Sequence, residues 1–141
     1  MYKYLEHEAD MGIYGEGETQ EEAFEEGARA MFDLMVDIKE VKSQKSKIKI
    51  KVEAKNIPEL FIEWLNELLA QSDLTGLIFG NFKIKKIKRE KDKYTLLSFA
   101  FGEPLDPKRH KIKTEVKGAT YSGLRCEEKN GRYYCQCVVD I

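Results

Sequence analysis

The N-terminal segment holds the first residues that could do chemistry, because it sets carboxylates and an imidazole at closely spaced positions. They are Glu6, His7, Glu8 and Asp10. On a strand such side chains alternate between the two faces, and the cluster could hold a metal ion. It could equally be a solvated strand edge, since charged residues on edge strands prevent aggregation. Spacing alone favours the solvated edge, and the metal site stays open as the alternative.

The C-terminal end supplies a second group of oxygen donors. Asp140 is followed by Ile141, so a side-chain carboxylate and an α-carboxylate stand within one residue of each other. Together with Asp10 they make three hard oxygen ligands, a set that suits Ca²⁺ or Mg²⁺ better than a soft metal. A cation site at Asp10, Asp140 and Ile141 is a hypothesis that the sequence allows and does not require.

The thiols of the chain are close together near the same end, at Cys126, Cys135 and Cys137. An odd number in this arrangement does not resemble the disulfide framework of a secreted domain, so we expect reduced thiols. Cys135 and Cys137 point to the same side of one strand, but with a single further cysteine they do not supply a tetrahedral zinc site. We interpret them as small buried residues.

A further group follows a proline-bounded loop. Arg109 and His110, with Lys117 and Tyr121, could form a basic, hydrogen-bonding patch, although an ordinary exposed loop explains these residues equally well. The sequence contains no Gly-rich phosphate loop, no supported Ser-His-Asp arrangement and no HExxH motif. Because these common catalytic motifs are missing, the hypothesis of an enzyme with its own reaction is weakened.

Two helices are predicted from their starting signals. Thr19 followed by Glu22 forms a capping box, and an apolar stripe at three- and four-residue spacing carries that helix to Val36. Asn56, Pro58 and Glu59 open a second helix that should end near Gln71. Trp64 lies in its apolar stripe and should be buried.

The remaining sequence predicts strands. The opening segment should form short strands joined at glycines, and residues 47–54 alternate lysines with Ile, Val and Ala, as in a strand with one wet face. Residues 77–89 and 94–102 predict a long hairpin, residues 110–116 alternate again, and Asn130-Gly131 joins 119–127 to 132–140. We therefore expect an α+β fold: a two-layer α/β sandwich, with both helices on one face of a mixed, mostly antiparallel sheet.

Composition limits the size and the partners of the protein. A chain of 141 residues with 42% apolar and 35% charged residues should form one domain over residues 1–141. Its 24 basic and 25 acidic residues give a net charge of −1, so direct RNA binding would need a local basic patch. No apolar run reaches the roughly 20 residues that span a bilayer, and the first residues have no signal-peptide pattern. We expect a cytoplasmic protein with no membrane contact.

Several separated motifs, taken in order, resemble the archease family. They are His7–Ile13, Thr19–Phe24, Ala30–Met35, Trp64–Leu69, Gly102-Glu103, Arg109-His110, Lys117–Tyr121 and Val139–Ile141. The match spans nearly the whole chain, and Gly118 is a mild departure where the family pattern favours alanine. Separated matches in the same order are much more specific than any one motif alone.

The resemblance implies a protein cofactor of the GTP-dependent tRNA-splicing ligase, which joins 2′,3′-cyclic phosphate and 5′-hydroxyl RNA ends. Such a cofactor promotes guanylylation of the ligase's active-site histidine and supports multiple turnover, with no catalytic residue of its own. The resemblance also implies an acidic site for Ca²⁺, or for Mg²⁺ or Mn²⁺, at Asp10, Asp140 and Ile141. His7, His110 and Lys117 are expected as partner or phosphate contacts, and RNA is expected to be met only through the ligase complex.

The sequence also allows two other functions. A metal-dependent phosphohydrolase or nuclease would employ the carboxylates directly, and would turn over RNA or phosphoesters by itself. A chaperone-like RNA-processing factor would bind many clients without depending on Asp10. The sequence leaves both as alternatives to the ligase activator.

Overall fold

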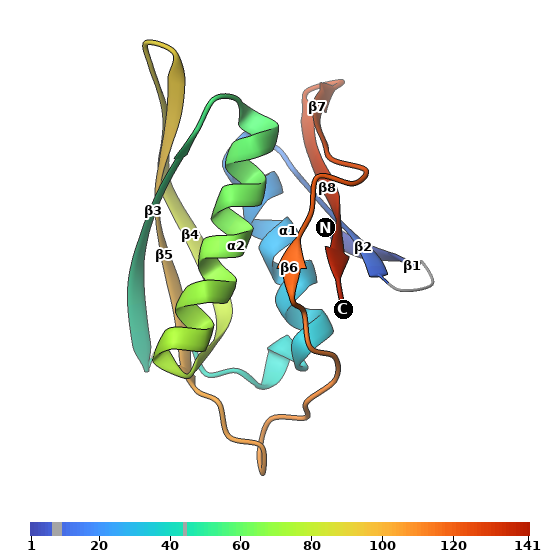
Figure 1. Ribbon diagram of the computed structural model, residues 1–141, viewed down its shortest axis with the longest axis vertical. Coiled ribbons are helices and arrows are strands. Elements are labelled where there is room, and N and C mark those ends of the chain that lie inside the picture. Colours follow the sequence, from blue (N-terminus) through green and yellow to red (C-terminus); the bar gives the residue numbers. More distant parts are fainter. Residues whose placement is uncertain (7–9, 44) are drawn as a thin grey trace.

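The computed structural model describes residues 1–6, 10–43 and 45–141 (Figure 1). Its elements follow in chain order: β1 (Tyr2–Glu6), β2 (Asp10–Gly17), α1 (Gln20–Met35), the short 3₁₀ helix η1 (Ile38–Glu40), β3 (Ser46–Ala54), α2 (Ile57–Thr75), β4 (Leu77–Glu90), β5 (Lys93–Pro104), β6 (Gly118–Ala119), β7 (Arg125–Lys129) and β8 (Arg132–Asp140).

The two helices lie between two sheets (Figure 1). One sheet has the order β1-β2-β8-β6, with β7 also paired to β8, and the other has the order β3-β5-β4. Each strand pair in the described residues is antiparallel. The α+β class is confirmed, and both helices lie on the same side of each sheet, as predicted. The strands divide into two sheets, where we expected one mixed sheet.

Helix α1 begins where the capping box predicts. The Thr19 hydroxyl accepts the N–H of Glu22 at 3.1 Å, which satisfies one of the free donors of the first turn. The Glu22 carboxylate accepts the N–H of Glu18 at 2.8 Å, one residue earlier than the Thr19 N–H of a standard capping box. A Cβ atom on Gly15 of β2 would lie 2.3 Å from the Gly27 nitrogen. Glycine at this position therefore lets β2 and α1 pack backbone to backbone.

Helix α2 begins at the predicted cap and ends later than expected. The Asn56 side chain accepts the N–H of Glu59 at 2.9 Å. The helix continues past Gln71 to Thr75 and stops at Gly76, whose φ of 72° is left-handed. The polar residues of its last turn broke the apolar pattern, and this is why the sequence predicted an earlier end.

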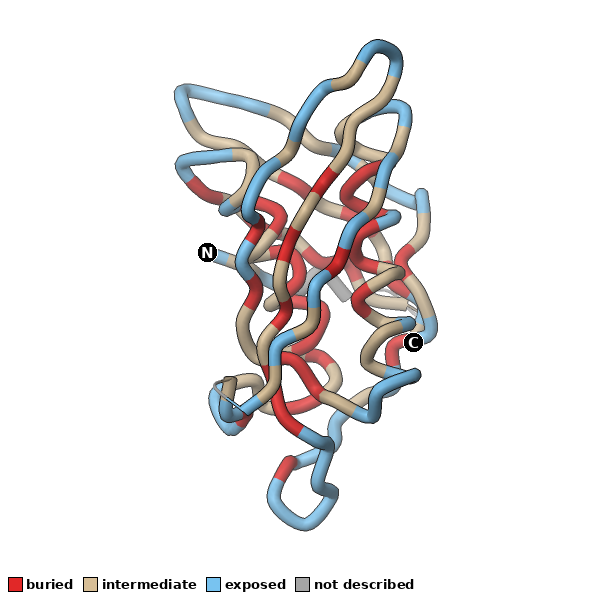
Figure 2. The backbone as a smooth tube through the Cα atoms, turned by 90° about the vertical axis from the view of Figure 1, so that its left-hand side faces the viewer, coloured by how far each residue is buried: buried red, intermediate tan, exposed pale blue. Residues whose placement is uncertain are grey.

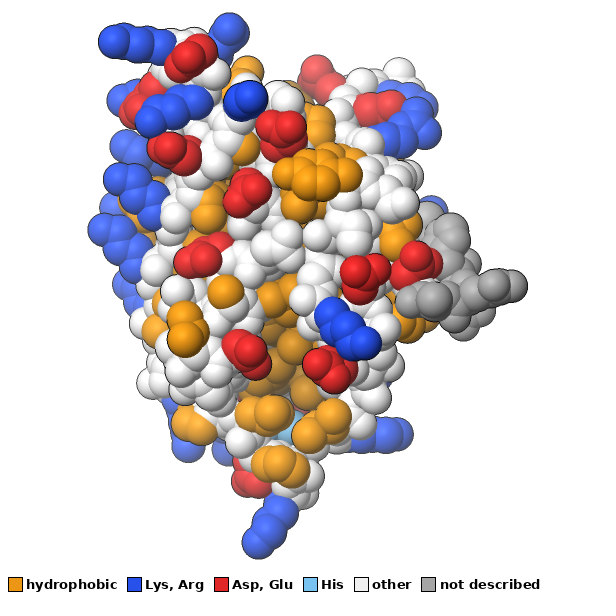
Figure 3. Space-filling view, in the orientation of Figure 1, with side chains coloured by type: hydrophobic (Ala, Val, Ile, Leu, Met, Phe, Trp, Pro, Cys, Tyr) orange, Lys and Arg blue, Asp and Glu red, His pale blue; other side chains and the backbone are white. Residues whose placement is uncertain are grey.

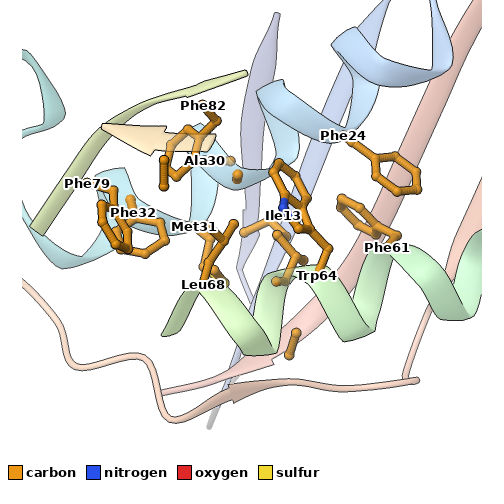
Figure 4. Packing of buried hydrophobic residues seen from close by; sticks show 14 of the residues in the cluster. Ile13, Phe24, Ala30, Met31, Phe32, Phe61, Trp64, Leu68, Phe79 and Phe82 are labelled. Atoms are coloured by element: carbon orange, nitrogen blue, oxygen red, sulfur yellow. The ribbon is translucent and has the colours of Figure 1, made fainter. Parts of the chain in front are cut away.

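Aromatic rings fill the space between the helices and the sheets (Figure 4). The Trp64 ring is 0% exposed, which confirms its predicted burial. Its centroid lies 6.0 Å from that of Phe24 and 6.2 Å from that of Phe82, and its indole N–H donates to the Ser98 hydroxyl at 2.8 Å. The one polar atom of this large ring is thus satisfied inside the core. None of the described helices has the length and apolarity needed to cross a membrane.

The segment between β5 and β6 differs from its prediction. Residues 110–116 form no strand, and their one bridge joins Ile112 to Val36. The N–H groups of Lys113 and Thr114 donate to the carbonyls of Met35 and Leu34 at the end of α1. This segment is therefore held by hydrogen bonds to the end of a helix and not by pairing within a sheet.

The hairpin between β7 and β8 follows its sequence signal. Asn130 and Gly131 have φ values of 54° and 77°, both positive, as a two-residue type I′ turn requires. The first strand of the hairpin is shorter than predicted, since β7 starts only at Arg125. Residues 118–119 pair with β8 separately, as β6.

Figure 2 looks onto the outer side of the β3-β5-β4 sheet. Buried positions along β5 alternate with partly exposed ones. Ile50, Leu96 and Ala100 point towards the helices and are at most 2% exposed. The intervening residues face away from the helices, so this sheet has a covered inner face and a free outer face.

Candidate functional site

Asp10 and Asp140 are brought together by the pairing of β2 with β8. They are direct partners in the antiparallel register, so their side chains lie on the same face of the sheet with Cβ atoms about 4.5–5.5 Å apart. The neighbouring inward residues Ile13, Cys137 and Val139 are buried against the helices. Alternation along the strands therefore directs both carboxylates to the outer face, where Asp140 is exposed and Asp10 partly exposed.

The backbone around Asp140 is fixed from its other side by β6. The Lys117 N–H donates to the Asp140 carbonyl at 2.8 Å, and Gly118 is the register partner of Asp140. The Thr120 N–H and hydroxyl both donate to the Val138 carbonyl, at 2.9 and 2.8 Å. The last residues of β8 are thus held between two strands and do not fray.

Asn66 ties this edge to helix α2. Its side-chain oxygen accepts the N–H of Ala119 at 2.8 Å, and its side-chain nitrogen donates to the Ala119 carbonyl at 3.1 Å. The amide therefore pairs with β6 as a neighbouring strand would. This role of Asn66 was not predicted from the sequence. Its position as a polar residue among the apolar residues of α2 could have indicated it.

Gly118, the departure from the family pattern, does not require glycine. A Cβ atom there would lie 3.5 Å from the Asn66 side-chain oxygen, an ordinary contact distance. Alanine would fit without displacing the Asn66 bridge to Ala119.

The donor set at the Asp10 and Asp140 pair fits a hard divalent cation. Two carboxylates directly opposite each other repel, and a bound cation would remove that repulsion and accept their oxygens. Among the described residues, no three side chains of His, Cys, Asp and Glu are grouped as metal ligands. A third protein ligand would have to come from the carboxylate of Ile141, the residue after Asp140, or from residues 7–9, which are outside the described range.

The three residues expected to contact a partner or phosphate, His7, His110 and Lys117, do not lie together in one described site. His7 lies outside the described residues. Lys117 is exposed, and its backbone N–H donates to the Asp140 carbonyl. The residue also lines a hollow of about 370 Å³ beside α2. Apolar residues including Met35, Leu69 and Val116 line this hollow together with polar and charged ones, among them Asp73 and Glu115. Figure 3 shows the apolar strip between α2 and the segment leading into β6, with acidic side chains on both sides.

His110 is not the exposed contact that we expected, because its side chain is buried. The residue is 1% exposed, and its Nε2 lies 2.9 Å from the Glu103 carboxylate. Its Nδ1 accepts the Asp106 N–H at 2.9 Å, so Nε2 carries the proton and donates it to Glu103. The ring therefore holds the loop after β5 in place and presents no surface to a phosphate.

Glu103 is the centre of this buried polar cluster. Its carboxylate also accepts the N–H of Lys42 at 2.7 Å and pairs with the Arg109 guanidinium. The pKa of Glu103 is lowered to about 2, mainly by the hydrogen bond from Arg109 and further by those from Lys42 and His110, which together outweigh the opposing effect of burial. Two sequence motifs, Gly102-Glu103 and Arg109-His110, thus form one structural unit.

The cysteines follow their sequence interpretation. Cys135 and Cys137 are buried and all three thiols are free. Burial raises the pKa of the Cys137 thiol to about 12 and raises that of Cys135 well above its ordinary value. A protonated thiol is neither a metal ligand nor a nucleophile, so these side chains serve as packing.

Comparison with known proteins gives matches over the full length. Residues 2–141 match the Archease protein family (MTH1598/TM1083). Protein archease of Pyrococcus furiosus is 43% identical over 141 residues, covering 99% of this chain and 98% of that protein. Protein archease of Methanosarcina mazei is 35% identical over 140 residues, covering 99% and 95%.

Solved structures share the fold. The solution structure of Methanobacterium thermoautotrophicum protein 1598 has a TM-score of 0.84 and 27% identity, and covers 99% of this chain and 98% of that one. The crystal structure of an archease, described as a possible chaperone, from Thermotoga maritima has a TM-score of 0.58 and 20% identity over 100% and 98% of the two chains. At that identity the second likeness concerns the fold alone.

Proposed function

Because the chain belongs to the archease protein family, we propose that it is an accessory protein that activates a GTP-dependent tRNA-splicing ligase. In this role it promotes guanylylation of the ligase and its repeated turnover, and it catalyses no reaction of its own. The observation that carries the proposal is the in-register pairing of Asp10 with Asp140. It joins two separated family motifs into one acidic surface site.

Asp10 and Asp140 are proposed to hold a divalent cation, Ca²⁺ in the first place and Mg²⁺ or Mn²⁺ as alternatives. When bound, such an ion would supply positive charge to the phosphates of a nucleotidyl transfer. The chain's own contribution is to fix both carboxylates on one sheet face, with the Asp140 backbone held by Lys117 and Gly118. A rigid support of this kind keeps ligands at a constant separation.

The hollow beside Lys117 supports the proposal that a protein partner binds near β6. The hollow is lined by apolar and polar residues together, and Ile112, on the same connecting segment, is a large apolar side chain that is 55% exposed. Surfaces that contact other proteins commonly combine apolar and polar side chains.

The proposal is tested by ligation in a reconstituted system with the ligase, GTP and RNA ends, with and without this protein. Asp10→Ala and Asp140→Ala should each abolish the stimulation of guanylylation while the thermal unfolding curve stays almost unchanged. Exposed carboxylates outside buried networks seldom alter stability by more than about 0.5 kcal/mol. Asp92→Ala, an exposed aspartate in the turn between β4 and β5, is the matched control and should stimulate normally.

Normal stimulation by Asp10→Ala would contradict the proposal. The same preparations distinguish the other functions. Hydrolysis of RNA or phosphoesters by the protein alone would indicate a nuclease or phosphohydrolase. Protection of unrelated proteins from aggregation, without dependence on Asp10, would indicate a chaperone.

A further inference from the structure

The outer face of the β3-β5-β4 sheet carries an ordered arrangement of lysines and aromatic rings. Register places Lys47 opposite Phe101, Lys49 opposite Phe99 and Lys51 opposite Leu97. Directly paired residues lie on the same sheet face, and on the other side of β5 the register places Lys83 opposite Phe99, Lys86 opposite Leu97 and Lys88 opposite Thr95. We call the resulting surface the lysine face: Lys47, Lys49, Lys51, Lys83, Lys86 and Lys88 around Leu97, Phe99 and Phe101.

The charge of the lysine face is mostly not neutralised. Two ion pairs lie towards the β4-β5 turn, Lys93 with Glu53 at 2.9 Å and Lys88 with Glu90 at 3.6 Å. Lys47, Lys49, Lys51 and Lys86 form no ion pair with a carboxylate of the described residues. Since the whole chain carries a net charge of −1, this positive field comes from placement and not from composition. Figure 3 shows the basic side chains gathered along the left edge, over this sheet.

The aromatic row between the lysines is accessible. Phe99 and Phe101 are partly exposed, although both sit on the central strand of the sheet. The Lys47 ammonium lies over the Phe99 ring, 4.3 Å from its centroid, so this face of the ring is covered by an exposed lysine side chain and not by the core. A base that displaced this side chain could stack on the ring.

We propose that the lysine face binds single-stranded RNA, with phosphates on the lysines and bases stacked on Phe99 and Phe101. Rows of cations beside aromatic rings on a sheet match the two parts of an unpaired strand, its charged backbone and its exposed bases. A duplex hides its base faces and would use only the charges. The choice of RNA over DNA rests on the proposed function. The lysine face itself is inferred from the fold and does not depend on that function.

Binding is measured by fluorescence anisotropy with a labelled single-stranded RNA of about 12 nucleotides, within the usual site sizes of such surfaces. The variant Lys47→Gln/Lys49→Gln/Lys51→Gln should bind at least about tenfold more weakly. It should also reduce the slope of log affinity against log salt by about 2, because each lost phosphate contact removes about 0.7 for a single strand. Lys39→Gln/Lys108→Gln/Lys111→Gln is the matched control, with the same charge change at exposed positions outside the three strands, and should bind within about twofold of the parent protein.

Phe99→Leu tests the stacking. It keeps an apolar side chain on β5 and should weaken binding about fivefold or more while leaving the salt slope unchanged, since no charge is lost. An RNA duplex of the same length should bind more weakly than the single strand. Equal affinity for duplex and single strand would exclude the stacking.

The proposal is overturned if the parent protein does not bind the RNA, or if both triple variants lose affinity equally. Binding of vesicles with anionic lipid in place of RNA, or tighter binding of single-stranded DNA, would overturn it as well. The RNA measurement uses the protein without a ligase, and Asp10→Ala leaves the lysine face intact. Failure here is therefore distinguishable from failure of ligase activation.

Discussion

Two carboxylates that face each other across paired strands repel, and Asp10 and Asp140 are held in that arrangement by β2 and β8. Solvent weakens this repulsion at an exposed sheet face, and a bound cation would replace it with attraction to both carboxylates. The helix-facing side of the same strands is buried and apolar, so substitutions of the two aspartates should act on binding and leave packing intact.

The first prediction at the residue scale concerns Ile141. Calorimetry with Ca²⁺, Mg²⁺ and Mn²⁺ should detect one cation site in the parent protein. Appending a single glycine after Ile141 should weaken that site, because the carboxylate would become a neutral amide carbonyl and the new charge would move several bonds away. Unchanged affinity in the extended protein would remove Ile141 from the ligands. Binding that persists in Asp10→Ala/Asp140→Ala would place the cation elsewhere.

The lowered pKa of Glu103 should make the free energy of unfolding depend on pH in the acid range. Its folded pKa of about 2 lies below the ordinary value of 4.5, so the unfolded chain binds more protons in the interval between them. The stabilisation is fully present above about pH 4.5 and is lost as pH falls towards about 2. The free energy of urea unfolding should therefore fall more steeply with acid in the parent protein than in Glu103→Gln. Parallel pH profiles would show that the cluster does not stabilise the carboxylate.

Substitutions of Trp64 measure how much its burial contributes to the free energy of unfolding. Trp64→Ala should reduce the free energy of unfolding by about 3–5 kcal/mol, the usual cost of removing a buried aromatic side chain. Trp64→Phe keeps a ring and loses mainly the hydrogen bond to Ser98, so it should cost roughly 1–2 kcal/mol. Urea denaturation measures both. A loss below about 1 kcal/mol for the alanine variant would mean that the site collapses around the cavity.

At the scale of elements, helix α2 takes part in the acidic site through Asn66. Asn66→Ala would leave the N–H and carbonyl of Ala119 without their partners, at a cost of about 1–3 kcal/mol. Hydrogen exchange at the Ala119 amide should accelerate by about tenfold or more, because β6 would open locally. Gln71→Ala on the same helix is the control, because within the described part of the chain the Gln71 side chain bonds only to Glu67. Unchanged exchange at Ala119 would show that β8 alone holds β6.

Element boundaries show which features a sequence can predict. Helix starts were predicted to within a residue, because Thr19 and Asn56 act through bonds to residues three positions away. The turn at Asn130-Gly131 was predicted because positive φ values depend on local chemistry. The course of residues 110–116 was not, because the N–H groups of this segment donate to the end of α1, which is distant in the sequence. His110 was misplaced for the same reason: its partner Glu103 lies across a loop.

At the scale of the whole molecule, two sheets share one pair of helices. Strand patterns predicted the buried faces of β3 and β8 correctly, but a buried face looks the same whether one sheet or two receive the helices. The division leaves two outer faces with different chemistry. One carries the Asp10 and Asp140 pair, and the other carries the lysine face, so the proposed cation and the proposed RNA would bind on opposite sides of the molecule.

The pairing of β2 with β8 also governs when the acidic site can exist. Strand β8 lies between β2 and both β6 and β7, yet it follows all three in the chain and leaves the ribosome after them. Until then one edge of β2 has no partner, and contacts between such distant segments form slowly. A nascent chain can therefore build the β3-β5-β4 sheet against its helices well before Asp10 meets Asp140. The acidic pair is in this sense a late product of folding, present only on molecules in which β2 and β8 have joined.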